Sequence, residues 1–198
     1  MELTGSLQLH HPDGQVFSFE PGSISVAFVV TGAPGHDAWF ETLVEPGDLA
    51  HWASDVLGAT GVAASPTDVV EAKRLRSAIW HAFVAVVGGE APRQEDRLLL
   101  NEVAGWEPLI PRLTRSGTHS WSRETRGRHV LSTVARDAIE LVGGPRAARL
   151  KLCQGLNCAI PFVDTSRPGN RRWCSMERCG NRAKARAHYH RTREEVSQ

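Results

Sequence analysis

Alternating apolar and polar residues at the start of the chain predict β structure. Residues 7–10 and 15–19 place an apolar side chain at every second position, and residues 11–14 between them contain the Pro and Gly of a turn. The apolar run over residues 24–31 indicates a further strand. A second hairpin is predicted over residues 109–121. These segments predict antiparallel strands in the N-terminal part of the chain.

Apolar residues at helical spacing then predict helices, over residues 48–57, 66–87, 92–104 and 128–142. The clearest signal is at residues 66–87. Ser65 is suited to be its N-cap, Pro66 occupies the first helical position, and Asp68 completes a capping box. Two glycines follow residue 87 and end the pattern.

The order of these elements predicts the α+β class. We expect an N-terminal domain over residues 1–144, built on an antiparallel sheet with packed helices. The Gly-Gly-Pro sequence at residues 143–145 is typical of a boundary. Residues 145–198 are then a second domain, a small four-cysteine zinc module.

All four cysteines of the chain lie in this second part, with the spacing C-x4-C-x15-C-x4-C. Two disulfides are the alternative to a metal, but they need an oxidising compartment. Residues 1–22 show no signal peptide, and the longest apolar run, residues 82–87, is too short to span a membrane. We therefore expect a cytoplasmic, metal-binding protein whose ligands are Cys153, Cys158, Cys174 and Cys179.

Four thiolates close the coordination shell of one Zn²⁺ ion, so the site is expected to be structural and not catalytic. Gly155 and Asn157 suit a tight turn in which backbone N–H groups approach sulfur. Strands are expected over residues 159–163 and 171–173, and a helix from about residue 178 to residue 194. A hairpin with one cysteine pair, followed by a helix whose start carries the other, is the layout of a treble-clef-like module.

Charge is divided unevenly along the chain, although the formal net charge is only +1. Residues 1–110 contain five Lys and Arg against fifteen Asp and Glu, whereas residues 146–198 contain twelve against four. A basic segment of this kind favours an anionic partner, most simply DNA. The alternatives are a solvated basic face, or docking of the basic end on the acidic part of the same chain.

Helical phase places several basic side chains and one aromatic within an arc of roughly 80°, namely Arg178, Arg182, Arg186, Tyr189 and Arg193. The candidate nucleic-acid contacts are Arg167, Arg171, Arg172, Arg182, Lys184 and Arg186. Asn181 and Trp173 are expected to support the metal site from outside its ligands. Arg182 is a candidate for the same supporting role at the metal site, as well as for a nucleic-acid contact.

Three stretches around the cysteines closely resemble the CGNR zinc-finger family, at residues 162–167, 171–176 and 179–184. The family is named for the tetrapeptide that begins here at Cys179. Its members usually carry an N-terminal domain called ABATE, described as a stress-induced transcription regulator. Residues 26–31, 75–76 and 100–101 resemble that domain more loosely. The resemblance implies a four-cysteine zinc site and DNA binding.

We conclude that the sequence predicts a zinc-dependent, DNA-binding transcription regulator whose N-terminal domain senses an effector or mediates assembly. That effector is either a small molecule or a protein, and a homodimer is left open. The alternative is a zinc-stabilised protein-interaction module that does not bind DNA. No phosphate-binding loop, H-E-x-x-H or G-x-S-x-G motif is present, so we do not expect an enzyme.

Overall fold

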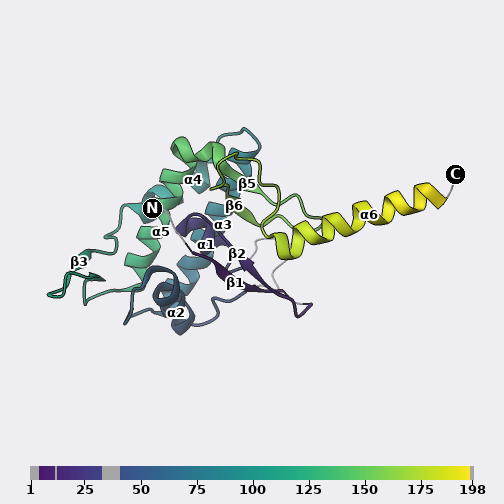
Figure 1. Cartoon of the computed structure of the whole chain (residues 1–198). Helices are drawn as coiled ribbons and strands as arrows, with labels where there is room; N and C mark the ends of the chain where they lie inside the picture. The colour runs from purple at the N-terminus through teal and green to yellow at the C-terminus, as the bar shows by residue number, and fades with distance from the viewer. Residues whose placement is uncertain (1–4, 12, 33–40, 197–198) are drawn as a thin grey trace.

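A bundle of helices forms the centre of the molecule in the computed structural model, which describes residues 5–11, 13–32 and 41–196 (Figure 1). Helices α3 (Pro66–Val87), α4 (Gln94–Ala104) and α5 (Gly127–Gly143) pack on one another. The short helix α1 (Ile24–Val29) and helix α2 (Pro46–Leu57) pack on this group. These five helices bury most of the apolar side chains of the N-terminal part.

Helix α3 confirms the strongest helical prediction at both of its ends. The Asp68 backbone N–H donates to Ser65 Oγ at 3.3 Å, and the Ser65 backbone N–H donates to Asp68 Oδ2 at 2.8 Å. This reciprocal capping satisfies two backbone donors that the helix itself leaves free. The helices predicted near residues 48–57, 92–104 and 128–142 are also present.

The strand predicted over residues 24–31 is wrong, because this segment forms helix α1. All six residues of α1 are buried, so its apolar run carries no periodicity that distinguishes a helix from a strand. Asp137 of α5 supplies the hydrogen-bond acceptor at the start of this helix. Its carboxylate accepts hydrogen bonds from Ser23 Oγ and from the Ser25 backbone N–H, the latter at 2.7 Å. A negative group at the amino end of a helix stabilises it.

The strands form three separate antiparallel hairpins in the described residues. Strand β1 (Leu7–His10) pairs with β2 (Val16–Phe19), β3 (Pro111–Leu113) with β4 (His119–Trp121), and β5 (Leu150–Leu152) with β6 (Pro161–Val163). The α+β class is confirmed, with small sheets in place of one larger sheet. The strand predicted at residues 171–173 is absent, and only its Arg172 carbonyl accepts a backbone hydrogen bond, from Gln154 at 3.0 Å.

The β5–β6 hairpin packs directly on the helical part of the molecule. Leu150, Phe162 and Val163 are buried and belong to the same core as the side chains of α1 and α3. The Val163 backbone N–H donates to the Pro21 carbonyl at 3.0 Å. Gly22, at a φ of 73°, lies so close that an added Cβ would meet Val163 Cβ at 3.0 Å. The N-terminal part and the cysteine-bearing part therefore share one continuous core.

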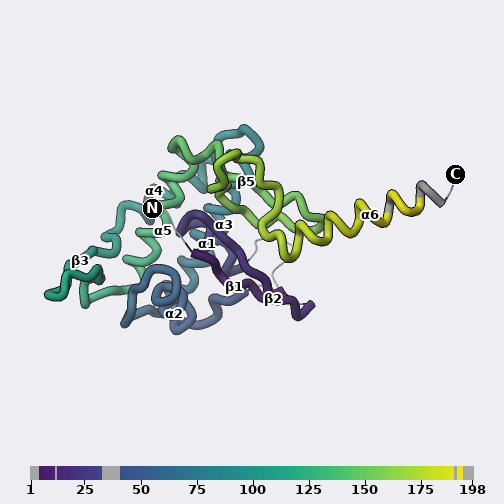
Figure 2. Tube along the Cα trace, viewed as in Figure 1, coloured from purple at the N-terminus to yellow at the C-terminus, as the bar shows by residue number. Residues whose placement is uncertain are grey.

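A short 3-10 helix (Pro145–Arg149) connects α5 to β5, and a single π-helical turn (Met176–Gly180) leads into the last helix, α6 (Asn181–Val196). Figures 1 and 2 show α6 extending away from the body, on the side opposite the β3–β4 hairpin. No helix in the described part of the chain has both the length and the apolar character needed to cross a membrane.

Replacing Asp137 with Ala should destabilise the fold. The substitution leaves the buried Ser25 N–H without its acceptor and removes one of the two partners of the Ser23 hydroxyl, which costs roughly 2–4 kcal/mol of the free energy of unfolding. Chemical denaturation measures this difference. Glu102→Ala, at an exposed position on α4, is the control and should change stability by less than about 0.5 kcal/mol. Equal stability of the two variants would contradict the assigned role of Asp137.

Candidate metal centre

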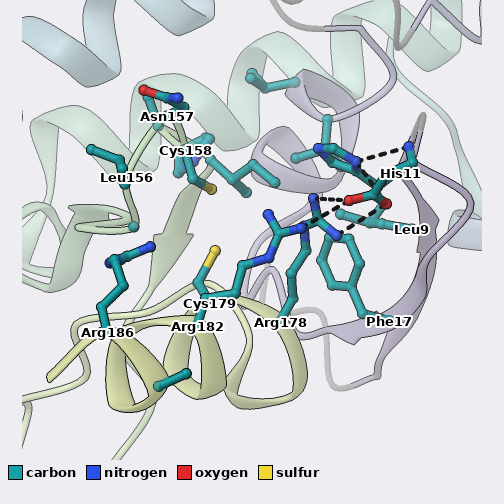
Figure 3. A pocket seen from close by; sticks show the side chains of 18 of the residues that line it. Leu9, His11, Phe17, Leu156, Asn157, Cys158, Arg178, Cys179, Arg182 and Arg186 are labelled. Carbon is teal, nitrogen blue, oxygen red and sulfur yellow. Dashed lines mark hydrogen bonds and ion pairs between the residues drawn. The ribbon is translucent and has the colours of Figure 1, made fainter. Parts of the chain in front are cut away.

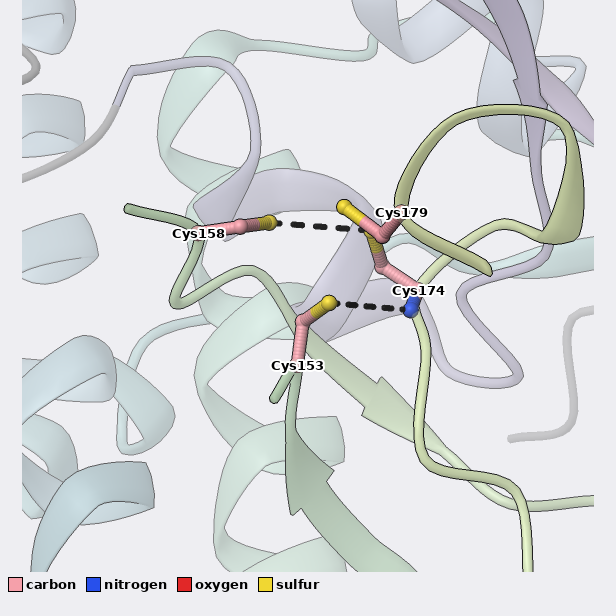
Figure 4. A group of neighbouring side chains, drawn as sticks. All are labelled: Cys153, Cys158, Cys174 and Cys179. Carbon is pink, nitrogen blue, oxygen red and sulfur yellow. Dashed lines mark hydrogen bonds between the residues drawn. The ribbon is translucent and has the colours of Figure 1, made fainter. Parts of the chain in front are cut away.

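The four cysteines converge on one point from two loops, as Figure 4 shows. Their Sγ atoms all lie within 4.8 Å of one another. The Cys174 sulfur is 3.7 Å from that of Cys158 and also 3.7 Å from that of Cys179. Zinc–sulfur bonds of about 2.3 Å in a tetrahedron place neighbouring sulfurs about 3.8 Å apart. The cluster therefore has the dimensions of a four-thiolate zinc site.

The loop that joins the first cysteine pair shows why its residue types matter. Gly155 donates its backbone N–H to Cys153 Sγ at 3.4 Å, and Asn157 adopts a left-handed backbone with a φ of 57°. A Cβ on Gly155 would lie 2.9 Å from Cys179 Sγ, which is closer than real contacts allow. Cys174 donates a second backbone N–H to Cys153 Sγ, at 3.3 Å. Both N–H groups are placed to stabilise a thiolate.

The four cysteines shift one another's pKa values. The neighbouring Cys158 thiol, followed by those of Cys174 and Cys179, lowers the pKa of Cys153. The hydrogen bond with Cys153 is the largest cause that raises the pKa of Cys158 and of Cys174. Four thiolates this close together would repel one another. A divalent cation offsets this repulsion and deprotonates coordinating thiols outright. The donor set fits one Zn²⁺ ion with no open coordination position.

An ion pair between the partly exposed Lys151 and the buried Asp164 braces the hairpin behind the cysteines. Lys151 Nζ donates to Asp164 Oδ2 at 2.8 Å and also to the Gly169 and Arg171 carbonyls. Burial raises the pKa of Asp164, but Lys151 and the donors of Ser166 and Arg171 outweigh it and hold that pKa below its usual range. These bonds fix the chain between β6 and Cys174. Lys151 was not among the residues singled out from the sequence.

The predicted nucleic-acid residues differ in their surroundings. Arg167, Arg172 and Lys184 are exposed, although Arg172 also donates to Gln154 Oε1 at 2.7 Å. Arg171 is different, because its guanidinium donates to the Trp173 and Cys174 carbonyls and stacks over Phe162 at 4.6 Å. It is thus bound to the segment that delivers Cys174. Arg186 is half-buried, and no hydrogen bond or ion pair joins it to another described residue.

An arginine contact links the start of the basic helix to the β1–β2 hairpin. Helical phase placed Arg178 in the basic arc, but the residue lies in the π-helical turn before α6 and is only 4% exposed. Its guanidinium donates to Asp13 Oδ2 at 2.9 Å and also contacts Gln15, and the exposed Arg182 donates to the same Asp13 oxygen at 2.9 Å. The Arg178 hydrogen bond lowers the pKa of Asp13 well below its usual range. The sequence shows Asp13 only as a turn residue.

Trp173 and Asn181 lie beside the metal centre without bonding a sulfur. Trp173 is partly buried against the core, close to Gly180. Asn181 donates its side-chain amide to the Glu177 carbonyl at 3.2 Å and so bridges the π-helical turn to α6. The side chain of Glu177 in turn accepts the Ser18 backbone N–H at 2.9 Å. The π-helical turn is therefore held on both sides, by α6 and by β2.

Four cysteine sulfurs at tetrahedral spacing, on a hairpin and at the start of a basic helix, define a structural zinc finger joined to an α+β domain. Residues 22–145 match the ABATE family, described as "Putative stress-induced transcription regulator", and residues 149–192 match the CGNR zinc finger. The chain therefore belongs to the ABATE family and continues into a CGNR zinc finger, which confirms the resemblance seen in the sequence. The descriptions name a transcription regulator and a zinc finger, and not an enzyme. No curated protein matches the chain.

Replacing Gly155 with Ala should weaken zinc binding by at least about tenfold, because groups that orient a metal ligand typically contribute that much. The added methyl group forces Cys179 Sγ out of the cluster. Competition with a chromophoric chelator measures the affinity. Asn157→Gly is the matched control, since glycine adopts the same left-handed backbone, and its affinity should stay within about threefold. Unchanged affinity in Gly155→Ala would contradict the assigned packing.

Proposed function

We propose that this protein is a cytoplasmic transcription regulator that binds duplex DNA through α6. The observation that carries this proposal is the placement of the helix. It extends away from the body, and residues 182–193 contain five Lys and Arg and no Asp or Glu (Figure 1). A helix about 10–12 Å across fits the major groove of DNA, which is about 12 Å wide. The basic helix is thus presented where a duplex can approach it.

The proposed contacts come from two segments of the zinc finger. Arg182, Lys184 and Arg186 lie in the first turns of α6, and Arg167 and Arg172 lie in the loops that precede Cys174. Guanidinium groups bind phosphate oxygens in pairs, and lysine acts as a point charge. Arg171 is left out of this surface. Its guanidinium is used to hold the chain around Cys174, and we assign it a positioning role.

Zinc has a structural part in this proposal. The four sulfurs tie the loop at residues 154–157 to the turn that begins the basic helix. α6 itself has no buried residue among its described side chains, so packing does not fix its direction. The metal centre and the Arg178–Asp13 contact do so instead. The shared core then makes the N-terminal domain the place where an effector can act on the helix.

A second candidate function is supported by the contact of Arg178 and Arg182 with Asp13. In this contact two arginines bind one carboxylate of the same chain, which supports binding to carboxylates on another protein. The zinc finger would then be an interaction module whose helix meets an acidic partner. In this candidate the protein binds no DNA, and the two proposals are separated by a direct binding experiment.

The zinc-loaded full chain should bind duplex DNA with a steep dependence on salt. Each neutralised phosphate contributes a slope of about −0.9 to the plot of log affinity against log salt. Arg182→Ala together with Arg186→Ala should weaken binding at least about tenfold and reduce the slope by about two units. Fluorescence anisotropy with a labelled duplex measures both quantities.

Arg97→Ala is the control for this experiment, since it removes an exposed arginine from α4, in the N-terminal domain. It should leave the affinity and the slope unchanged. Zinc-loaded protein that fails to bind DNA at micromolar concentration would contradict the proposal and favour the interaction module. Equal losses in the α6 double variant and in Arg97→Ala would place the contact surface elsewhere.

A further inference from the structure

A large open cleft lies where the β1–β2 hairpin, the helical body and the zinc finger meet. Its volume is about 1260 Å³. Figure 3 shows the loop with Leu156 on one side of the cleft, and the start of α6 with Arg182 and Arg186 on the other. Cys158 and Cys179 are also part of the wall. The cleft is therefore built partly from the metal centre itself.

The floor of the cleft is apolar. Its larger apolar side chains come from both strands of the N-terminal hairpin, from the end of α1, from α3, and from the cysteine loop and the start of β6: Leu9, Phe17, Val29, Val30, Trp80, Leu156, Ile160 and Pro161. Leu156 is 68% exposed at the tip of its loop, where it has no packing reason to be hydrophobic. Binding sites for small molecules are typically concave and lined in this way, with a few polar groups that set orientation.

Arginines supply the polar groups. Three guanidinium groups line the cleft, those of Arg178, Arg182 and Arg186, against a single carboxylate, that of Asp13. Asp13 is bonded to Arg178 and shares one oxygen with Arg182, and Arg186 has no such partner in the described chain. A four-thiolate zinc centre in the wall carries a formal charge of −2, which the three guanidinium groups offset. Arg178 is buried and paired with Asp13, so the cationic groups that face a ligand are Arg182 and Arg186.

We propose that this cleft binds an amphipathic organic acid, with one carboxylate on Arg182 and Arg186 and an acyl or aromatic body on the apolar floor. A planar guanidinium pairs with a carboxylate through two parallel hydrogen bonds. The β1–β2 hairpin, which supplies Leu9, Asp13 and Phe17, lies outside both ranges that match the families. The site therefore depends on a part of this chain that neither family match covers.

Arg182 and Arg186 are also the proposed DNA contacts. If the proposed function holds, a ligand in the cleft therefore regulates DNA binding. A carboxylate that occupies Arg182 and Arg186 competes with DNA phosphate for the same donors. The acid is then an effector that releases the regulator from DNA. Binding of the acid itself requires no DNA and is tested separately.

Decanoate is a suitable probe, because it joins one carboxylate to a flexible apolar chain. Isothermal titration calorimetry of the zinc-loaded full chain, below the micellar concentration of the probe, should show one site. Decyltrimethylammonium has a comparable chain with the opposite charge and should bind at least tenfold more weakly. Failure of decanoate to bind at millimolar concentration, or equal affinity for both amphiphiles, overturns the proposal.

Ala185→Glu gives the sharper test. Ala185 lines the cleft from the exposed surface of α6, and a glutamate there places a negative charge one turn from Arg182. Decanoate affinity should fall at least tenfold. Ala187→Glu adds the same charge at an exposed position of α6 that does not line the cleft, and affinity should stay within twofold. Equal effects of the two variants overturn the assigned site.

Competition is then measured by adding decanoate to the complex of the protein with labelled DNA. We expect DNA affinity to fall as decanoate saturates its site. DNA binding that is unaffected by saturating decanoate rejects the regulatory consequence and leaves the binding site in place. Absence of DNA binding rejects the proposed function alone, because the calorimetric result stands without it.

Discussion

The mutual repulsion of four cysteine thiolates within 4.8 Å of one another is the constraint on which this molecule depends. A divalent cation among the sulfurs offsets this repulsion, and two backbone N–H groups donate to Cys153 Sγ and so stabilise its thiolate. Binding of zinc to such a site carries a folding free energy of roughly 10–16 kcal/mol in comparable peptides. The segment around the cysteines buries few apolar side chains of its own, so that energy decides whether the loop and the π-helical turn stay together.

Zinc does not act alone, because the finger is joined to the rest of the chain in two ways. Phe162 and Val163 enter the core of α1 and α3, and Arg178 reaches Asp13 on the β1–β2 hairpin. Both joints lie within a few residues of a metal ligand. A conformational change in the N-terminal part can therefore reach α6 through these contacts. This arrangement suits a regulator, in which a sensing part must alter the surface that meets its target.

Features that depend on residues close together in the chain could be predicted from the sequence, whereas features that depend on distant residues could not. Cysteine spacing identified the metal site, and the sequence Ser65-Pro66 with Asp68 identified the start of α3, because neighbouring residues decide both. The helix α1 was missed, since its apolar run suits either conformation and its cap comes from Asp137, more than a hundred positions away. Asp13 was missed for the same reason. The contact surface for DNA stays a prediction.

Zinc is expected to fix the start of α6 and its contact with the β1–β2 hairpin. Hydrogen exchange of backbone amides, compared between zinc-loaded and chelator-treated protein, measures whether it does. We expect metal removal to speed exchange in residues 153–186 and in β1–β2, while α3 and α5 keep their protection. Unchanged protection of the first turns of α6 and of the hairpin after metal loss would contradict the account.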